Sequence, residues 1–342
     1  MLSMPYVAGR TAPDLRTPQL TTTVPREYVH RAAVSEVFLT GWRADPVGSP
    51  DPSFTVTAQW PRSHALFARE GGYQDPMLLL ESVRQTGSLL AHAEFGVPFG
   101  HQFVMSDLTA HAEPALLVAG PTPTETELRT VCRDITRRDG RLTAMRYDVT
   151  VLRDGVPLGT ATAAFRCMSP AVYRRVRGER PTLARGATPP AVAPFAVGHT
   201  SARHVVLAVP EPAPPAPTLP HLRIQPWAQP RARPVPGARG RWELRVDTEH
   251  PTYFDHPVDH VPGMVLLEAA RQAAHASTGL PDALVLGVRG AFARYAELDA
   301  PCWIEAHPEP AGADGDVRVR VTGTQQRQTV FTADLMVRPR TR

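Results

Sequence analysis

Two octapeptides of this chain carry polar side chains at matching positions of an otherwise apolar pattern. They are LLLESVRQ at 78–85 and VLLEAARQ at 265–272, separated by a constant offset of 187 residues. The shared polar residues are Glu81, Arg84 and Gln85 in the first and Glu268, Arg271 and Gln272 in the second. Spacings of three and four residues place each set on one face of a helix.

A glutamate beside an arginine on an apolar helix allows two interpretations. Buried charges are costly to desolvate unless they are paired, so each pair could be a structural ion pair that fixes its helix to a neighbour. Alternatively, Glu81 or Glu268 removes a proton from a substrate hydroxyl, with a pKa that burial raises into a useful range. Arg84 or Arg271 would then bind a phosphate dianion or stabilise the charge of a tetrahedral intermediate.

The loop FDHPVDHVPG, at 254–263, places four titratable side chains directly before the second helix. The spacing of His256, Asp259 and His260 could hold a metal ion, but two prolines interrupt any helix that would support it, so no metal site is predicted. Either Asp–His hydrogen bonds shape this loop, or a histidine acts as acid or base. His256 is favoured over His260 for the second role.

The two helices begin differently. Pro262 and Gly263 open the second helix and leave its first amides free to bind an oxyanion or a phosphate. At the aligned point before the first helix, Asp75 is a typical N-cap, which is a structural role. Upstream, His64 aligns with His250 when one gap is allowed, and His64 is interpreted as a loop or edge histidine rather than a catalytic one.

Composition excludes several classes of protein. All 37 basic residues are arginine, so neither a lysine Schiff base nor a Walker phosphate loop is available. The net charge is only +4, without a basic stripe, and no apolar run approaches the ~20 residues of a membrane span. The N-terminus has no signal-peptide pattern, and three scattered cysteines indicate a reducing compartment. We therefore expect a cytoplasmic protein that binds neither nucleic acid nor membrane.

The repeat extends well beyond the octapeptides. FTVTAQWPRSHALF (54–67) is echoed by WELRVDTEHPTYF (242–254), and alternating apolar segments follow each helix. The predicted strands after the first helix are 102–108, 115–119, 128–133, 142–153 and 158–167, and those after the second are 284–294, 301–307, 315–322 and 328–337. One buried helix among antiparallel strands makes each copy an α+β unit.

The chain is accordingly divided into a tail (1–23), a first domain (24–177), a linker (178–198) and a second domain (199–342). The second domain carries a proline-rich insertion at about 210–240. Within it, ARHVVLAV (202–209) is a strand candidate. Next to the linker, RRVRGER (174–180) is either a solvated arginine-rich face or a surface that docks an acidic carrier protein.

These motifs carry a resemblance to a known family. DHPVDHVPGMVLLEAARQ resembles the loop and helix of acyl-carrier-protein 3-hydroxyacyl dehydratases, which have the hot-dog fold. More closely, VPREYVHRAAVSEVFLT, AQWPRSHALF, DPMLLLESVRQTGSLLAHAEFGVPFGHQF and FDHPVDHVPGMVLLEAARQAA resemble the A-factor biosynthesis (AfsA-type) family, from about Val24 to Val337.

The resemblance implies a tandem hot-dog protein, in which each antiparallel curved sheet wraps round one long buried helix. It implies an acyltransferase that moves a 3-oxoacyl chain from acyl carrier protein to the hydroxyl of dihydroxyacetone phosphate, in γ-butyrolactone-type signalling molecule biosynthesis. The acyl chain would be carried on the phosphopantetheine of the carrier protein, with no bound cofactor. The two units would form a pseudo-dimer within one chain, and a further homodimer is left open.

Two alternatives remain: a dehydratase or thioesterase that acts on carrier-bound acyl groups, and a non-catalytic acyl- or autoregulator-binding protein. Dehydratases place a histidine 14 residues before the helix glutamate, where this chain has Phe254, so dehydration is disfavoured. In hot-dog pairs a site combines the loop of one unit with the helix of the other, and the sequence does not choose between Glu81 and Glu268. We predict catalytic roles for Glu268, Arg271, His256 and Glu81, and substrate-binding roles for Arg84, Gln85, Gln272, Asp255, Asp259, His260, Gly263, His64 and His250.

Overall fold

Eleven antiparallel strands form one continuous sheet in the computed structural model, which describes residues 21–46, 48, 50–67, 71–180, 188–209 and 240–340. The strand order is β1-β2-β4-β5-β6-β3-β8-β11-β10-β9-β7. The first half contains β1 (Leu39–Ala44), β2 (Ser53–Trp60), β3 (Gln102–Ala112), β4 (Thr124–Arg138), β5 (Arg141–Arg153) and β6 (Val156–Met168). The second contains β7 (Gly240–Glu243), β8 (Leu284–Phe292), β9 (Cys302–Pro308), β10 (Val317–Gln325) and β11 (Gln328–Arg338).

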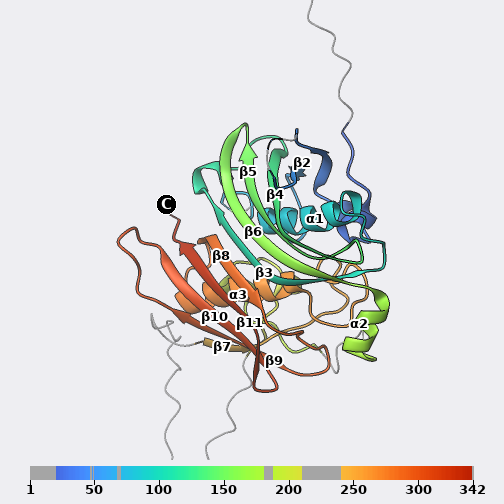
Figure 1. The fold of residues 1–342 in the computed structure, drawn as a ribbon. Helices are drawn as coiled ribbons and strands as arrows, with labels where there is room; N and C mark the ends of the chain where they lie inside the picture. Colours follow the sequence, from blue (N-terminus) through green and yellow to red (C-terminus); the bar gives the residue numbers. More distant parts are fainter. Residues whose placement is uncertain are drawn as a thin grey trace, which may run out of the picture.

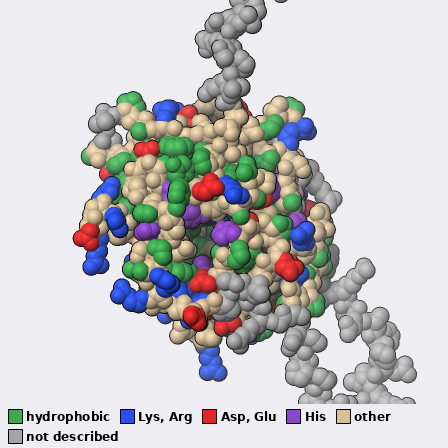
Figure 2. All heavy atoms as spheres, turned by 90° about the vertical axis from the view of Figure 1, so that its right-hand side faces the viewer, with side chains coloured by type: hydrophobic (Ala, Val, Ile, Leu, Met, Phe, Trp, Pro, Cys, Tyr) green, Lys and Arg blue, Asp and Glu red, His purple; other side chains and the backbone are tan. Residues whose placement is uncertain are grey.

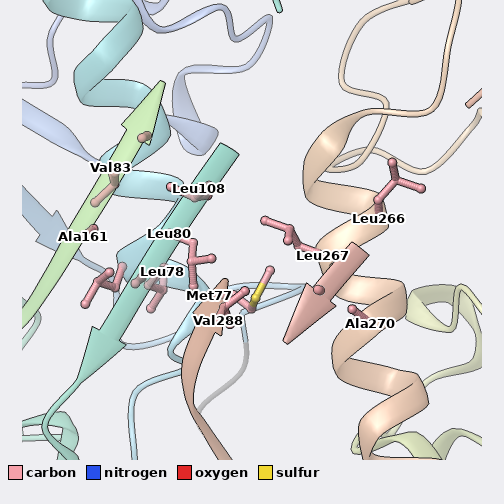
Figure 3. Close-up of a cluster of buried hydrophobic side chains, with 14 of the residues drawn as sticks. Met77, Leu78, Leu80, Val83, Leu108, Ala161, Leu266, Leu267, Ala270 and Val288 are labelled. Carbon is pink, nitrogen blue, oxygen red and sulfur yellow. The ribbon is translucent and has the colours of Figure 1, made fainter. Parts of the chain in front are cut away.

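Each half of the sheet curves round one helix (Figure 1). These helices are α1 (Met77–Ala93) and α3 (Gly263–Thr278), and most residues of both are buried because their sequences are apolar almost all round. Side chains of both helices and of the strands between them belong to one apolar cluster (Figure 3). The predicted α+β units are therefore present, and they share a single core.

The two halves meet through β3 and β8, which pair antiparallel from Asp107↔Ala291 to His111↔Gly287. This pairing removes an exposed edge from each half-sheet. It also relates the halves by an approximate twofold axis, so that the N-terminus of each helix faces the other unit. That arrangement positions the site described below.

Short elements complete the fold. A third α-helix, α2 (Pro170–Arg177), follows β6 directly and begins at Ser169, whose Oγ accepts the amide of Val172. The 3₁₀ helices are η1 (Arg26–Val29), η2 (Val34–Glu36), η3 (Pro114–Leu117), η4 (Pro194–Val197) and η5 (Ala202–His204). Among the described residues, no helix is both long and apolar enough to cross a lipid bilayer.

Some sequence-based expectations for elements were wrong. The strand expected at 115–119 is largely the 3₁₀ helix η3, because Pro114 opens a tight turn there. The strand expected at 202–209 contains η5 and then only isolated bridges at Leu207 and Ala208. The helix α2 was not expected. The insertion predicted at about 210–240 lies outside the described residues except for Gly240, as does most of the tail 1–23.

Candidate active site

Glu81 lies at the centre of a charged cluster on α1. Its Oε1 accepts hydrogen bonds from Arg31 Nη2 at 2.6 Å, Arg84 Nη2 at 2.7 Å and Gln85 Nε2 at 2.8 Å. Burial alone raises the pKa of Glu81, but the charges of Arg31 and Arg84 outweigh burial and lower it to about 2. The expected rise of this pKa is thus corrected, because the sequence pattern did not reveal the second arginine.

Glu268 has an equivalent cluster on α3. Its carboxylate accepts from Arg271 Nε at 2.9 Å and Gln272 Nε2 at 2.7 Å, and it contacts His199 Nε2 at 2.7 Å. Burial alone raises the pKa of Glu268, but Arg271 and His199 outweigh burial and lower it to about 2. The expected rise is corrected here as well.

His199 of the second unit occupies the place of Arg31 in the first. Gln85 donates to the carbonyl of Glu36, five residues after Arg31, and Gln272 donates to the carbonyl of His204, five residues after His199. The first cluster therefore has two arginines beside its glutamate, whereas the second has one arginine and a histidine. The two glutamines hold backbone segments and do not line the large cavity described below.

The loop before α3 packs against the cluster on α1. Arg31 Nη1 donates to the carbonyl of Thr252 at 3.0 Å, and the amide of Ala32 donates to Asp255 Oδ2 at 2.8 Å. Arg31 and Asp255 also form an ion pair at 3.7 Å. Of the two arrangements that the sequence left open, the structure places the His256 loop against Glu81, across the pseudo-twofold.

Asp255 and His256 form a carboxylate–imidazole pair. Asp255 Oδ1 lies 2.5 Å from His256 Nδ1, and the carboxylate is buried while the His256 side chain is 45% exposed. Burial raises the pKa of Asp255, but the hydrogen bond from His256 and the charge of Arg31 produce a net lowering. Because Nδ1 is held by the carboxylate, Nε2 is the nitrogen of His256 that can meet a substrate.

A second carboxylate–imidazole pair joins the loop to α2. Asp259 Oδ1 lies 2.8 Å from His260 Nδ1 and accepts from the hydroxyl of Tyr173 at 2.6 Å. Arg177 of α2 donates to Asp259 at 3.2 Å and, through both Nη atoms, to Glu297 at 2.7 and 2.8 Å. Burial raises the pKa of Asp259, yet the hydrogen bonds from His260 and Tyr173 lower it well below its ordinary value. Asp259 thus anchors α2 rather than facing the cavity.

One cavity of about 670 Å³ brings these groups together. Its polar wall includes Arg31, Glu81, Arg84, Asp255, His256 and His260. Its apolar wall includes Leu66, Phe103, Met105, Phe165, Leu266 and Phe292. Figure 2 views the side of the molecule that carries α2 in Figure 1 and shows a hollow near its centre with histidine side chains beside it.

The N-terminus of α3 opens into this cavity. Gly263 and Met264 line it, and their amides donate to no group of the described residues. In α1 the corresponding end is closed, because Asp75 Oδ1 accepts the amide of Met77 at 2.8 Å. Asp75 therefore has the capping role expected from the sequence.

Asp75 also closes the second pseudo-equivalent site. Its Oδ2 accepts from Arg271 Nη1 at 3.1 Å, and the remaining space beside Asp75 and Arg271 is only about 30 Å³. Glu268 touches the large cavity, but Arg271 is absent from its wall. The two clusters predicted as equivalent sites thus differ: the one on α1 is open and the one on α3 is filled.

The predicted substrate-binding histidines outside the loop lie elsewhere. His64 Nδ1 accepts the amides of Leu66 and Phe67, and His250 Nδ1 accepts those of Thr252 and Tyr253. This shared pattern matches the alignment with one gap. Neither histidine lines the large cavity, but the residues whose amides they accept, Leu66 and Phe67 or Thr252 and Tyr253, do line it.

Sequence reasoning missed several polar residues of the cavity wall, and two of them lie beside the cluster on α1. Arg31 and His30 both come from VPREYVHRAAVSEVFLT, which has no helical or strand periodicity to mark them. His30 Nε2 lies 2.7 Å from His92 Nε2, and burial together with the charge of Arg84 lowers the pKa of His30 to about 3. A neighbouring His–Arg pair was the only signal. Within the described part of the chain, no group of three His, Cys, Asp or Glu side chains could share a metal ion.

Comparisons with known proteins agree with this architecture. The family model "A-factor biosynthesis hotdog domain" matches residues 14–169 and again 184–340, which confirms the predicted tandem hot-dog fold. A 2-oxo-3-(phosphooxy)propyl 3-oxoalkanoate synthase of Streptomyces virginiae is 48% identical over 92% of this chain and 97% of its own length. A protein of the same name from Streptomyces coelicolor is 39% identical over 93% of this chain and 92% of its own.

Among solved structures, a 12:0-ACP thioesterase from Umbellularia californica is similar with a TM-score of 0.47 and 11% identity, over 84% of this chain and 94% of that one. The two family matches cover both halves of the sheet, and two relatives align over nine tenths of the sequence. The chain therefore belongs to the AfsA family of A-factor biosynthesis hotdog-domain proteins.

Proposed function

We propose that this protein is a 2-oxo-3-(phosphooxy)propyl 3-oxoalkanoate synthase. It transfers a 3-oxoacyl chain from the phosphopantetheine of an acyl carrier protein to the hydroxyl of dihydroxyacetone phosphate, in the biosynthesis of γ-butyrolactone-type signalling molecules. One observation carries the proposal. A single cavity joins an arginine cluster, a histidine held by a carboxylate, free helix amides and an apolar wall, and the name of its relatives describes an ester with a phosphate at one end and an acyl chain at the other.

The apolar wall is suited to the acyl chain. Phe103, Met105 and Phe165 come from β3 and β6, and Leu266 and Phe292 come from α3 and β8. A cavity of about 670 Å³ lies within the usual range for small-molecule sites. Burial of each methylene of the chain contributes about 0.8 kcal/mol.

The arginines of α1 and η1 are suited to the phosphate. Arg84 donates through Nε and Nη2, and its Nη1 has no partner among the residues that the structure describes. With Glu81 and Asp255 ionised, the two carboxylates balance the charges of Arg31 and Arg84, and Nη1 of Arg84 remains available to an anion. In the closed cluster a single arginine, Arg271, faces two carboxylates, Glu268 and Asp75. Anion binding is therefore favoured at the first cluster.

The free amides at the start of α3 are suited to the thioester carbonyl. Gly263 and Met264 present two N–H donors at the positive end of a 16-residue helix dipole. Donors fixed in this way stabilise the negative charge that develops on the carbonyl oxygen during attack.

We assign the transfer of the substrate hydroxyl proton to His256. The substrate hydroxyl oxygen attacks the thioester carbon while its proton passes to Nε2 of His256. The tetrahedral intermediate then collapses, the carbon–sulfur bond breaks, and the phosphopantetheine thiolate takes the proton from Nε2 of His256. Asp255 stabilises the imidazolium formed between these steps. Glu81, ionised and bonded to two arginines, positions Arg31 and Arg84 and does not act as the base.

A transfer assay tests the proposal. The protein is incubated with a 3-oxoacyl-carrier protein and dihydroxyacetone phosphate, and the products are followed by mass spectrometry. A phosphorylated ester, or the butenolide that forms from it, is expected. Free 3-oxo acid without the ester would indicate a thioesterase instead, and tight acyl binding without turnover would indicate a binding protein.

A further inference from the structure

The helix α2 divides into an anchored face and a bare face. Tyr173 and Arg177 point inward and are held by Asp259 and Glu297. The guanidinium of Arg177 also lies 4.0 Å from the centre of the Tyr295 ring. These contacts fix an eight-residue helix firmly on the second unit.

The bare face is apolar and positively charged. Val172 is 37% exposed and Val176 is 59% exposed. Arg175 is exposed next to them on the helix surface, and Arg174 is exposed at the opposite edge of the bare face. Among the described residues, no carboxylate forms an ion pair with Arg174 or Arg175. Single exposed valines are ordinary, but two on one helix with unpaired arginines make a surface suited to an acidic, partly apolar partner.

This bare face lies at the edge of the cavity. Val176 and Arg180 belong to both: they are exposed on the surface, and they also line the cavity that contains His256. A partner seated on α2 would therefore have a direct route inward for a flexible arm. In Figure 1, α2 lies at the lower right, on the side that Figure 2 turns toward the viewer.

We propose that Val172, Arg174, Arg175, Val176 and Arg180 form the docking surface for the acyl carrier protein. This inference rests on the proposed function, because it identifies where the carrier of the thioester binds. The arginines meet acidic side chains of the carrier, the valines meet an apolar residue between them, and the phosphopantetheine arm enters past Val176 and Arg180. Neither Arg174 nor Arg175 lines the cavity, so both can be changed without altering the chemistry.

The test compares two acyl donors with the variant R174E/R175E. One donor is a 3-oxoacyl-carrier protein, and the other is the N-acetylcysteamine thioester of the same acid, which has no protein to dock. The variant is expected to raise KM for the carrier-protein donor about tenfold or more, with kcat/KM for the small thioester unchanged. With dihydroxyacetone phosphate saturating, the wild-type reaction with the carrier protein is also expected to slow as salt rises, whereas the small-thioester reaction is not.

A matched control reverses two exposed arginines elsewhere. R318E/R320E lies on the outward positions of β10, away from the cavity wall, and should behave as wild type with both donors. Binding of the holo carrier protein, measured by calorimetry, gives a readout that does not require turnover. Circular dichroism establishes that both variants are folded.

Three results would overturn the docking surface. Affinity and KM for the carrier protein could be unchanged in R174E/R175E. The variant could lose kcat/KM equally with both donors, which would mean that α2 only shapes the cavity. Light scattering could instead show a wild-type dimer that the variant separates, which would assign the surface to a second copy of this chain. If wild type transfers from neither donor, the proposed function fails, and the calorimetry still decides whether α2 docks the carrier.

Discussion

At the scale of single residues, the site depends on which charges are neutralised. Glu81 and Glu268 look identical in sequence, and both are ionised and buried in the structure. The difference lies in their partners: Glu81 has two arginines, and Glu268 has one arginine and a histidine. This difference makes the first cluster the more favourable place for an anion, and we assign proton transfer to His256 because Glu81 is held by two arginines.

Replacement of His256 by asparagine tests that assignment. His256→Asn keeps a polar side chain beside Asp255 but cannot take up a proton, so kcat is expected to fall roughly 10²–10⁴-fold with little change in KM. His111→Asn, at an exposed position on β3, is the matched control and should leave kcat unchanged. Wild-type turnover in His256→Asn would remove this histidine from the mechanism.

The buried glutamates also predict how stability depends on pH. The folded pKa of Glu81 and of Glu268 is about 2, below the ordinary value of 4.5, because nearby arginines favour the ionised form. A lowered pKa stabilises the fold above pH 4.5, and this stabilisation is lost as pH falls toward 2. The free energy of unfolding of the wild-type protein, measured with urea, should fall steeply between about pH 4.5 and 2.

The variant Glu81→Gln isolates one contribution. It should be less stable than wild type at pH 7 and should lose less free energy of unfolding between pH 4.5 and 2. Glu125→Gln, at an exposed position on β4, should follow the wild-type profile. Equal acid sensitivity in Glu81→Gln and wild type would show that the ion pairs with Arg31 and Arg84 do not stabilise the folded state.

The sequence identified the titratable side chains on the helices but not the direction in which their pKa values shift. Helical spacing brought Glu81 and Arg84 together, whereas Arg31 lies 50 residues away in an irregular segment. Burial alone predicts a raised pKa for both glutamates, but Arg31 and Arg84 lower the pKa of Glu81, and Arg271 and His199 lower that of Glu268. Partners that are distant in the sequence determine such shifts, and no local pattern identifies them.

At the scale of elements, the two helix N-termini determine which site is open. Asp75 accepts the first amide of α1, that of Met77, and pairs with Arg271, whereas Pro262 and Gly263 leave the first amides of α3 uncovered. A helix N-terminus is a site for negative charge, and a carboxylate of the chain itself occupies it in one unit only.

Placing a cap on α3 should therefore abolish activity without unfolding the protein. In Pro262→Asp, the new carboxylate can accept the free amides and occupy the place that we assign to the thioester oxygen. We expect kcat/KM to fall at least ~100-fold, as for loss of an oxyanion donor. The melting temperature should stay close to wild type, because a cap contributes ~0.5–2 kcal/mol and loss of the proline costs ~0.4–1 kcal/mol.

The control for this variant is Pro262→Ala, which removes the proline without adding a carboxylate and should stay active. Loss of activity in both variants would mean that the proline itself matters. Full activity in Pro262→Asp would show that the amides of α3 do not bind the reacting group.

Most long elements were predictable, because their periodicity is strong. Both buried helices and the strands that form the half-sheets follow from apolar patterns that repeat at the 187-residue offset. The exceptions are short. Pro114 begins the 3₁₀ helix η3 where a strand was expected at 115–119. The helix α2 was not predicted because its arginines are typical of a solvated surface, and the sequence does not show that Arg177 is buried.

At the scale of the whole molecule, fusion of two units permits them to diverge. A symmetric pair of identical units would contain two equal sites, but here one sheet joins unequal halves through β3 and β8. The open cavity combines α1 of the first unit with the loop and N-terminus of the second. The repeat predicted two pseudo-equivalent sites that begin differently, but which of them is open depends on side-chain contacts across the pseudo-twofold, and these are not periodic in the sequence.

One comparison tests the central claim, that the α1 site works and its α3 counterpart is structural. Arg84→Met and Arg271→Met alter equivalent positions, and transfer of the 3-oxoacyl group to dihydroxyacetone phosphate is measured for both. Arg84→Met should stay folded and lose kcat/KM by ~100-fold or more, as expected when a charge-assisted phosphate contact is removed. Arg271→Met should melt at a lower temperature, because Asp75 and Glu268 lose their partner, yet its folded fraction should transfer at the wild-type rate. Loss of transfer in folded Arg271→Met with full activity in Arg84→Met would contradict the account.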